Sequence, residues 1–188
     1  GYAAGTTTQG SSAVAIGFNT GNNLQGGSAV AIGVSAGQTT QGTSAVAIGN
    51  LAASDVQGNL SVAIGNESGR YNQQANAIAL GSNSGRTSQG AGGTALGDSS
   101  GTSAQGTGAT SVGQLSGQTS QGSYGVAVGF NAGKTTQGGN SVAIGKSAGQ
   151  TTQAGNAVAV GNSAGATSQG ASSVAIGISS GATSQGAS

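Results

Sequence analysis

Few side chains in this 188-residue chain could carry acid–base, nucleophilic or metal-binding chemistry. There is no histidine and no cysteine, so the chain has neither an imidazole base nor a thiolate nucleophile. We therefore expect no enzyme activity, no catalytic residue, no cofactor site and no metal site. The charged residues on which such sites would depend are Asp55, Glu67, Asp98, Arg70, Arg86, Lys134 and Lys146.

Charge and hydropathy argue against two further classes of partner. Charged residues make up 4% of the chain and the formal net charge is +1, which is too little for a basic nucleic-acid-binding surface. The sequence contains no run of about 18 apolar residues that could cross a bilayer. We expect no nucleic-acid partner and no membrane insertion in this segment.

A sixteen-residue repeat organises the whole chain. Glycine recurs at every sixteenth position from Gly17 to Gly177, and glutamine does so from Gln9 to Gln185 without an insertion. Each unit reads approximately SAVAIGxxAGxTTQGx, and 188 residues divided by sixteen gives 11.75 units. A fixed period of this kind indicates a repeat architecture in which each unit packs on its neighbours. Residues 1–188 are expected to form one domain that is a piece of a longer fibrous protein.

The residues within one unit indicate two short β-strands joined by glycine turns. Residues 13–16 (AVAI) end at Gly17, and residues 38–41 (QTTQ) lie between Gly37 and Gly42. Helix is disfavoured because each glycine in a helix costs about 1 kcal/mol. We predict an all-β fold, namely a parallel β-solenoid with sixteen residues per coil and about 11.75 coils.

Stacking of equivalent residues explains why the columns of the repeat stay constant. Each residue would lie on its counterpart in the next coil, about 4.8 Å away. Identical neighbours then form ladders, aliphatic on aliphatic and amide on amide. Glycines at the turns permit positive φ angles. The residues expected in these structural ladders are Val14, Ile16, Gly17, Gln25, Val30, Ile32, Gly33, Gln41, Val142, Ile144, Gly145 and Gln153.

The direction of the valine and isoleucine columns is left open by the sequence. Successive side chains of a strand point to opposite faces, so Val14 and Ile16 point one way and Ala15 the other. If alanine fills the coil, an aliphatic stripe on the order of 800 Å² faces outward and needs a partner, most simply further copies of the chain. If valine and isoleucine point inward, the solenoid is a monomer with an alanine surface.

Two segments carry a resemblance to known fibre proteins. Residues 140–145 (NSVAIG) resemble the head repeats of trimeric autotransporter adhesins, and residues 31–37 (AIGVSAG) resemble repeats of bacteriophage and large-virus fibre proteins. The resemblance extends over the entire chain. It implies a left-handed parallel β-roll and a homotrimer with valine and isoleucine at its centre. The adhesin repeat is usually shorter than sixteen residues, and we expect the additional residues to lengthen the second strand and its turn.

The resemblance also implies a function. It suggests a non-enzymatic, structural or adhesive segment of an extracellular fibre, at a cell surface or on a virion or phage. Its partners would be the other chains of the homotrimer and a host surface, a matrix protein or a glycan. The alternative is a monomeric ice-binding solenoid with a threonine-rich flat face. Asp55 and Tyr71 interrupt the row in question, whose threonines are Thr39, Thr87, Thr119, Thr135, Thr151, Thr167 and Thr183.

The repeat is weakest between residues 91 and 113. Thr94 and Thr110 stand where most units have valine, and Ser111 replaces alanine. Two glycines also precede the first of these strands, and glycine loses the most conformational freedom on folding. We predict that this is the least stable part of the solenoid.

Overall fold

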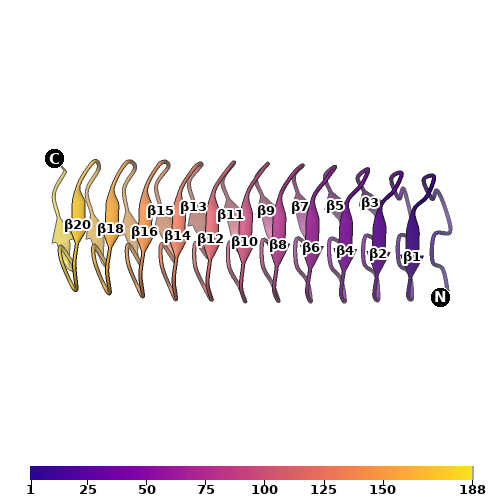
Figure 1. Ribbon diagram of the computed structural model, residues 1–188, viewed down its shortest axis with the longest axis horizontal. Helices are drawn as coiled ribbons and strands as arrows, with labels where there is room; N and C mark the ends of the chain where they lie inside the picture. Colours follow the sequence, from indigo (N-terminus) through magenta and orange to yellow (C-terminus); the bar gives the residue numbers. More distant parts are fainter. Residues whose placement is uncertain (188) are drawn as a thin grey trace.

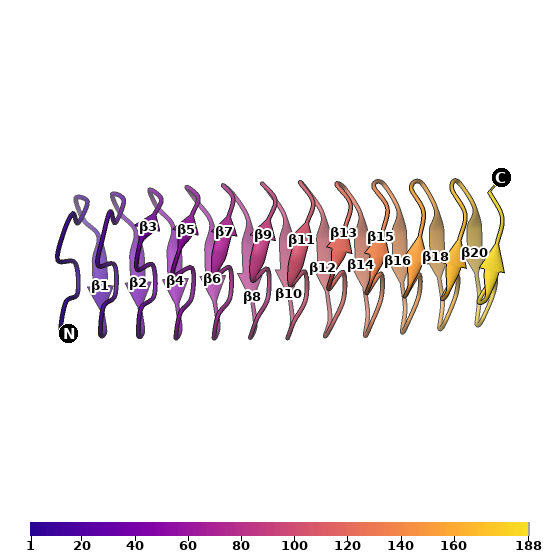
Figure 2. The ribbon, with the colours of Figure 1, turned by 180° about the vertical axis from the view of Figure 1, so that it is seen from behind.

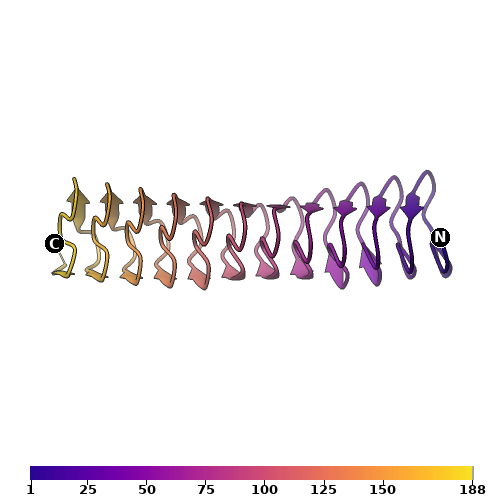
Figure 3. The same ribbon diagram turned by 90° about the horizontal axis from the view of Figure 1, so that it is seen from below.

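The protein, described by a computed structural model over residues 1–187, is a rod of stacked coils with its termini at opposite ends (Figure 1). Each coil contributes short strands to two sheets, and no helix occurs in the described residues. The second sheet comes to the front when the rod is seen from behind (Figure 2). From below, the two sheets form separate layers (Figure 3). The predicted all-β parallel solenoid is confirmed.

The first sheet contains eleven strands in chain order. Each strand begins with a β-branched residue and is followed by a glycine, so a favourable strand residue and a turn residue bound it in every coil. The strands are β1 (Val14–Ile16), β2 (Val30–Ile32), β4 (Val46–Ile48), β6 (Val62–Ile64), β8 (Ile78–Leu80), β10 (Thr94–Leu96), β12 (Thr110–Val112), β14 (Val126–Val128), β16 (Val142–Ile144), β18 (Val158–Val160) and β20 (Val174–Ile176).

The second sheet contains ten strands, and each of them ends at a glutamine. They are two or three residues long, shorter than the four-residue segment expected from the repeat. The strands are β3 (Thr40–Gln41), β5 (Val56–Gln57), β7 (Tyr71–Gln73), β9 (Thr87–Gln89), β11 (Ser103–Gln105), β13 (Ser120–Gln121), β15 (Thr136–Gln137), β17 (Thr152–Gln153), β19 (Ser168–Gln169) and β21 (Ser184–Gln185).

Neighbouring strands pair in parallel with an offset of one repeat. In the first sheet Val14 lies opposite Val30, and in the second sheet Gln137 lies opposite Gln153. The turns follow the same ladder, since Gly33 donates its backbone N–H to the Ile16 carbonyl at 2.8 Å. Coils about 4.8 Å apart therefore satisfy each other's backbone groups along the rod.

The interior of each coil is filled by small side chains and glutamine. The middle residue of ten strands in the first sheet is alanine, and from Ala31 to Ala175 these alanines are buried. Val30 and Ile32 on either side of Ala31 are partly exposed. Because side chains alternate along a strand, valine and isoleucine point out of the coil. The inward-facing alternative, with alanine on the surface, is wrong.

Glutamine side chains connect the two sheets across this thin interior. Gln73 is fully buried, and its Nε2 donates to the Val62 carbonyl at 2.9 Å, the Ala77 carbonyl at 3.4 Å and Oε1 of Gln89 at 3.0 Å. A buried amide with partners of this kind is stabilising, whereas an unpaired one would be costly. The amide ladder is not continuous: within the described residues, Oε1 has no hydrogen-bond partner in Gln25, Gln57, Gln105 and Gln185.

The glycine after each first-sheet strand is required by the close approach of the next coil. Gly33 has a φ of +131°, and a Cβ at this position would lie 2.4 Å from the carbonyl oxygen of Gly49. No side chain fits at that distance, and L-residues rarely adopt such a φ. The turn therefore accepts only glycine if the coils are to keep their spacing.

Three consecutive coils differ from the others in the second sheet. Strands β7, β9 and β11 have a middle residue with positive φ, namely Asn72 (55°), Ser88 (54°) and Ala104 (53°). Their pairing omits this residue, since Tyr71 lies opposite Thr87 and Gln73 opposite Gln89. The two-residue strands from β13 onward lack this feature.

Candidate functional site

The outward side of the first sheet is a predominantly aliphatic surface, which we call the apolar face; Thr94 and Thr110 are its two polar residues. It consists of the first and third residues of the eleven strands, such as Val142 and Ile144 of β16. These side chains are exposed or partly exposed in every strand; Ile16 is 56% exposed and Ile176 is 66% exposed. The coil does not need them for its own core, which alanine and glutamine already fill.

The size of the apolar face is comparable to that of a stable protein interface. Eleven strands about 4.8 Å apart extend over about 50 Å, and two columns of side chains give on the order of 800 Å². A standard interface buries roughly 800 Å² on each partner, whereas monomers seldom expose more than a few hundred Å² of continuous apolar surface.

Exposed aromatic residues lie at the N-terminal end of the rod. Phe18 lies two residues after the end of β1 and is 49% exposed, and its ring stacks on Tyr2 with centroids 5.7 Å apart. Val34 occupies the equivalent position in the next coil and is also exposed. Phe130 lies seven repeats from Phe18, so the two phenylalanines belong to separate patches.

The outward side of the second sheet is polar, and in its C-terminal part it carries pairs of hydroxyl groups. We call this surface the hydroxyl face. It extends over five consecutive coils without an interruption, and all of its side chains are exposed. Its residues are Thr119, Ser120, Thr135, Thr136, Thr151, Thr152, Thr167, Ser168, Thr183 and Ser184. Tyr71 and Asp55, which interrupt the threonine row, lie in coils closer to the N-terminus.

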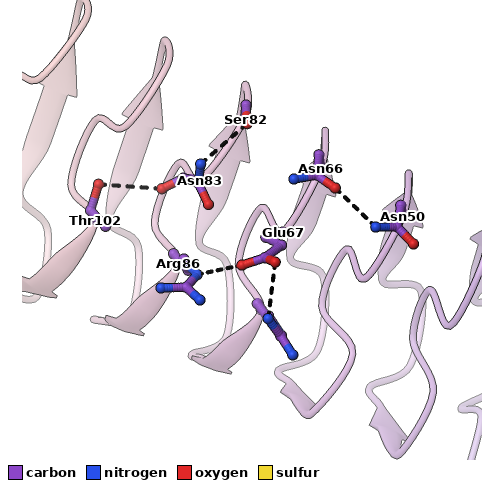
Figure 4. A network of polar contacts seen from close by, with 8 residues as sticks. Asn50, Asn66, Glu67, Ser82, Asn83, Arg86 and Thr102 are labelled. Carbon is purple, nitrogen blue, oxygen red and sulfur yellow. Dashed lines mark hydrogen bonds and ion pairs between the residues drawn. The ribbon is translucent and has the colours of Figure 1, made fainter.

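A cluster of ionic and aromatic groups lies beside β7. Glu67 bridges two arginines of successive coils: its Oε1 is 3.0 Å from Nη1 of Arg70, and its Oε2 accepts from Nε of Arg86 at 2.6 Å (Figure 4). The guanidinium carbons of Arg70 and Arg86 lie 4.6 Å and 5.7 Å from the centroid of the Tyr71 ring, within range of a cation–π interaction. The negative charge of Glu67 offsets the repulsion between the stacked arginines.

The protonation of Glu67 reflects these contacts. Partial desolvation raises the pKa of Glu67, but the hydrogen bonds and positive charges of Arg86 and Arg70 together lower the pKa below its ordinary value of 4.5. Arg70 is only three residues from Glu67 in the sequence. The sequence did not indicate Arg86, which is nineteen residues away and reaches Glu67 only because the coils stack.

Polar side chains near this cluster form ladders between coils. Asn50 donates from Nδ2 to Oδ1 of Asn66 at 3.0 Å, and Thr102 donates to the Asn83 carbonyl at 3.4 Å (Figure 4). These contacts satisfy the corner residues of adjacent coils and leave no convergent set of groups around a ligand-sized space. They act as structural links between coils.

The described residues offer no enclosed site. Within residues 1–187 there is no pocket, and no group of three or more acidic, histidine or cysteine side chains converges to hold a metal ion. No helix in this part of the chain is long and apolar enough to span a bilayer. The extended apolar and hydroxyl faces are therefore the surfaces on which function can be argued.

Comparison with known proteins gives no assignment. No protein-family model matches this chain, and neither a curated protein nor a solved structure matches it. The function has to be argued from the geometry of the two faces.

Proposed function

We propose that this chain is a rigid, non-enzymatic segment of an extracellular fibre in which copies associate side by side through the apolar face. The observation that carries the proposal is that the third residue is aliphatic in all eleven first-sheet strands and the first residue in nine of them, while alanine and glutamine already fill the core of the coils. Complete burial of an exposed valine or isoleucine contributes about 1.5–3 kcal/mol, and these partly exposed side chains would each contribute a fraction of that value. A second copy offers a matching surface of the same length and chemistry.

The assembly we propose is a parallel homotrimer at a cell surface or on a virion or phage. Stiffness would come from the uninterrupted backbone ladders of both sheets. Low charge limits nonspecific electrostatic attraction, so adhesion to a host surface, a matrix protein or a glycan would use the repeated polar surfaces that stay outside the trimer. The likeness of the repeats to adhesin head repeats supports this reading.

Solution mass tests the proposal directly. Light scattering is expected to give three times 17.2 kDa for the wild-type chain. The double variant Ile48→Lys, Ile144→Lys places two charges in the apolar face and should give a monomer with unchanged far-UV circular dichroism, because an unpaired buried charge is strongly unfavourable. The matched control Ser120→Lys, Thr152→Lys carries the same charges on the hydroxyl face and should remain a trimer. A monomeric wild-type chain would refute the proposed assembly.

The second candidate function, ice binding, is favoured by one specific observation. The hydroxyl face presents paired hydroxyl groups in five consecutive coils, with a regular two-residue strand in each and a spacing of about 4.8 Å along the rod. A flat array of this regularity could hold water in ordered positions. Thermal hysteresis at millimolar protein tests it: activity that is lost on Thr151→Lys supports ice binding, and its absence in the wild type excludes it.

A further inference from the structure

The regularity of the apolar face creates a problem for any side-by-side assembly. Successive strands present nearly the same aliphatic pair, as Val30 with Ile32 and Val46 with Ile48 do. A neighbouring copy displaced by one coil, about 4.8 Å, would therefore still pack aliphatic against aliphatic. Register is weakly specified where the pattern repeats in this way, and a polar residue at a core position is one way to fix it.

The apolar face contains one polar interruption, which lies near its middle. Thr94 of β10 and Thr110 of β12 are adjacent in the sheet, and both side chains are partly exposed. Their aliphatic neighbours in the same column are Ile78 on one side and Val126 on the other. The remaining first-position residues of the face are valines and isoleucines.

The two threonine hydroxyls are unpaired within the chain. The backbone carbonyls of Thr94 and Thr110 accept hydrogen bonds from Nε2 of Gln105 and Gln121, both at 2.8 Å. Within residues 1–187, however, neither threonine Oγ1 donates to or accepts from another group. Solvent satisfies them in a single chain, whereas association through the apolar face would remove that solvent and make partners necessary.

We infer that Thr94 and Thr110 set the register of a parallel, in-register trimer. This inference rests on the proposed association through the apolar face. Around a threefold axis, three Thr94 hydroxyls at one height can each donate to the next and accept from the previous one, so that every hydroxyl is satisfied. Thr110 forms a second ring one coil further along. A pair of hydroxyls in a dimer shares a single bond and leaves one donor without a partner.

Displacement of one chain by a coil breaks this arrangement. Thr94 of the first chain then faces Thr110 of its neighbour. Thr110 of the first chain faces Val126 of the neighbour, and Thr94 of the neighbour faces Ile78 of the first chain. Two hydroxyls are left among aliphatic side chains, and each buried unsatisfied hydroxyl disfavours the displaced state by about tenfold or more. The aliphatic coils supply affinity, and the threonine pair selects one alignment.

Disulfide trapping distinguishes the registers, since the chain has no cysteine of its own. An unlabelled Val46→Cys chain and a ¹⁵N-labelled Val62→Cys chain are unfolded together, refolded in equal amounts and oxidised. Intact mass then separates light–light and heavy–heavy dimers, which form in register, from light–heavy dimers, which require a one-coil displacement. The mixture is prepared with three forms of the apolar face: wild type, Thr94→Val with Thr110→Val, and Thr94→Ser with Thr110→Ser.

The expected result is that light–heavy dimers are below about one tenth of the total for wild type and for the serine form, which keeps the hydroxyls. In the valine form they should become as abundant as the in-register dimers, while all three forms keep the mass of three chains. A valine form that stays in register, or a wild type that is already mixed, overturns the inference but leaves the trimer intact. Wild-type monomers would overturn the trimer itself.

A second pair of cysteine variants tests chain direction. If two copies lay antiparallel with Thr94 opposite Thr110, Val46 would lie opposite Val158, because the two positions are equidistant from the threonine pair. Oxidation of Val46→Cys with ¹⁵N-labelled Val158→Cys is therefore expected to yield no light–heavy dimer. Formation of that dimer would overturn the parallel rings of hydroxyls.

Discussion

The two sheets of the rod differ in how constant their outward-facing residues are from coil to coil. In the second sheet the inward residue is always glutamine, whereas the outward residue before it changes from coil to coil, from Thr40 to Val56 to Asn72. In the first sheet the outward positions remain aliphatic in almost every coil, as constant as the buried alanines. A coil can therefore fold with a varied outer surface on one sheet. The packing of a single coil therefore does not account for the constancy of the apolar face.

The largest effect should come from enlarging an inward residue of the first sheet. Ala143 is fully buried and belongs to a cluster with Ala127, Ala148 and Ala159. Ala143→Leu adds three carbons to an interior without space for them. We expect a loss of about 3 kcal/mol and a fall in melting temperature of roughly 10 °C, measured by circular dichroism.

The matched control for this change is the adjacent residue on the other side of the strand. Val142 points outward and is partly exposed, so Val142→Leu should change stability by less than about 1 kcal/mol. If the two leucine substitutions were equally destabilising, Ala143 would not be more buried than Val142, contrary to the structure.

The next effect in size concerns the inward glutamines of the second sheet. Nε2 of Gln121 donates to the Thr110 and Gly125 carbonyls at 2.8 Å and 3.0 Å, and its Oε1 accepts from Ser111 at 2.6 Å. Gln121→Leu removes these three hydrogen bonds; the Gly125 carbonyl keeps the Thr110 backbone N–H at 2.8 Å, whereas the buried Ser111 hydroxyl loses its acceptor. We expect a loss of about 2 kcal/mol, measured as a lower midpoint of urea unfolding.

An outward glutamine nearby provides the control for that measurement. Gln114 is exposed, and within residues 1–187 the only hydrogen bond of its side chain is that from Nε2 to the carboxylate of Asp98 at 3.4 Å. Gln114→Leu should move the midpoint by the equivalent of less than about 0.5 kcal/mol. If both substitutions had the same effect, the interior amides would contribute no more than surface ones.

The strands and turns of each coil can be predicted from the sequence because the same residue types recur every sixteen residues. Strand residues 13–16 appear as Val14–Ile16, and residues 38–41 as Thr40–Gln41, each shorter by one or two residues. The direction of Val14 could not be predicted, since an AVAI strand alternates equally well in either orientation. The structure shows that the buried glutamines leave room beside them only for a small side chain, which is alanine in ten strands and Ser111 in β12.

The repeat does not predict contacts between residues that occupy different positions of the sixteen-residue unit. Stacking predicts neighbours sixteen residues apart, as for Asn50 and Asn66, and it places Arg70 on Arg86 as like charges. It does not predict that Glu67 lies between the two arginines, because that contact depends on the shape of the corner. The positive φ of Ala104 was also invisible, since alanine rarely adopts it.

A smaller, local effect is expected along the rod itself. Residues 91–113 contain Thr94 and Thr110 on the outer side and Ser111 in the interior, and Gly92 has a φ of +64° with open space beside it. We expect their amides to exchange roughly tenfold faster than those of β14 to β18, measured by hydrogen exchange. Equal protection along the rod would contradict the prediction and would indicate that the bond from Ser111 to Gln121 compensates for the missing alanine.

The smallest effect is expected at the ionic cluster beside the second sheet. The pKa of Glu67 is lowered by Arg86 and Arg70, so the folded state favours the charged carboxylate. Its contribution is complete above the ordinary pKa of 4.5 and is lost as the pH falls through the lowered value. At pH 7, Glu67→Gln should cost about 0.5 kcal/mol, because the three side chains are partly exposed.

That cost should disappear in acid and in salt. As the pH falls below 4.5 and through the lowered pKa of Glu67, the unfolding curves of wild type and Glu67→Gln are expected to converge, because the carboxylate takes up its proton. At pH 7 the difference should also shrink in about 1 M salt. Asp98→Asn is the control, since Asp98 forms no ion pair within residues 1–187. This substitution should leave the free energy of unfolding at pH 7 unchanged. A difference that persists once Glu67 is protonated would mean that Glu67 acts by packing and not by charge.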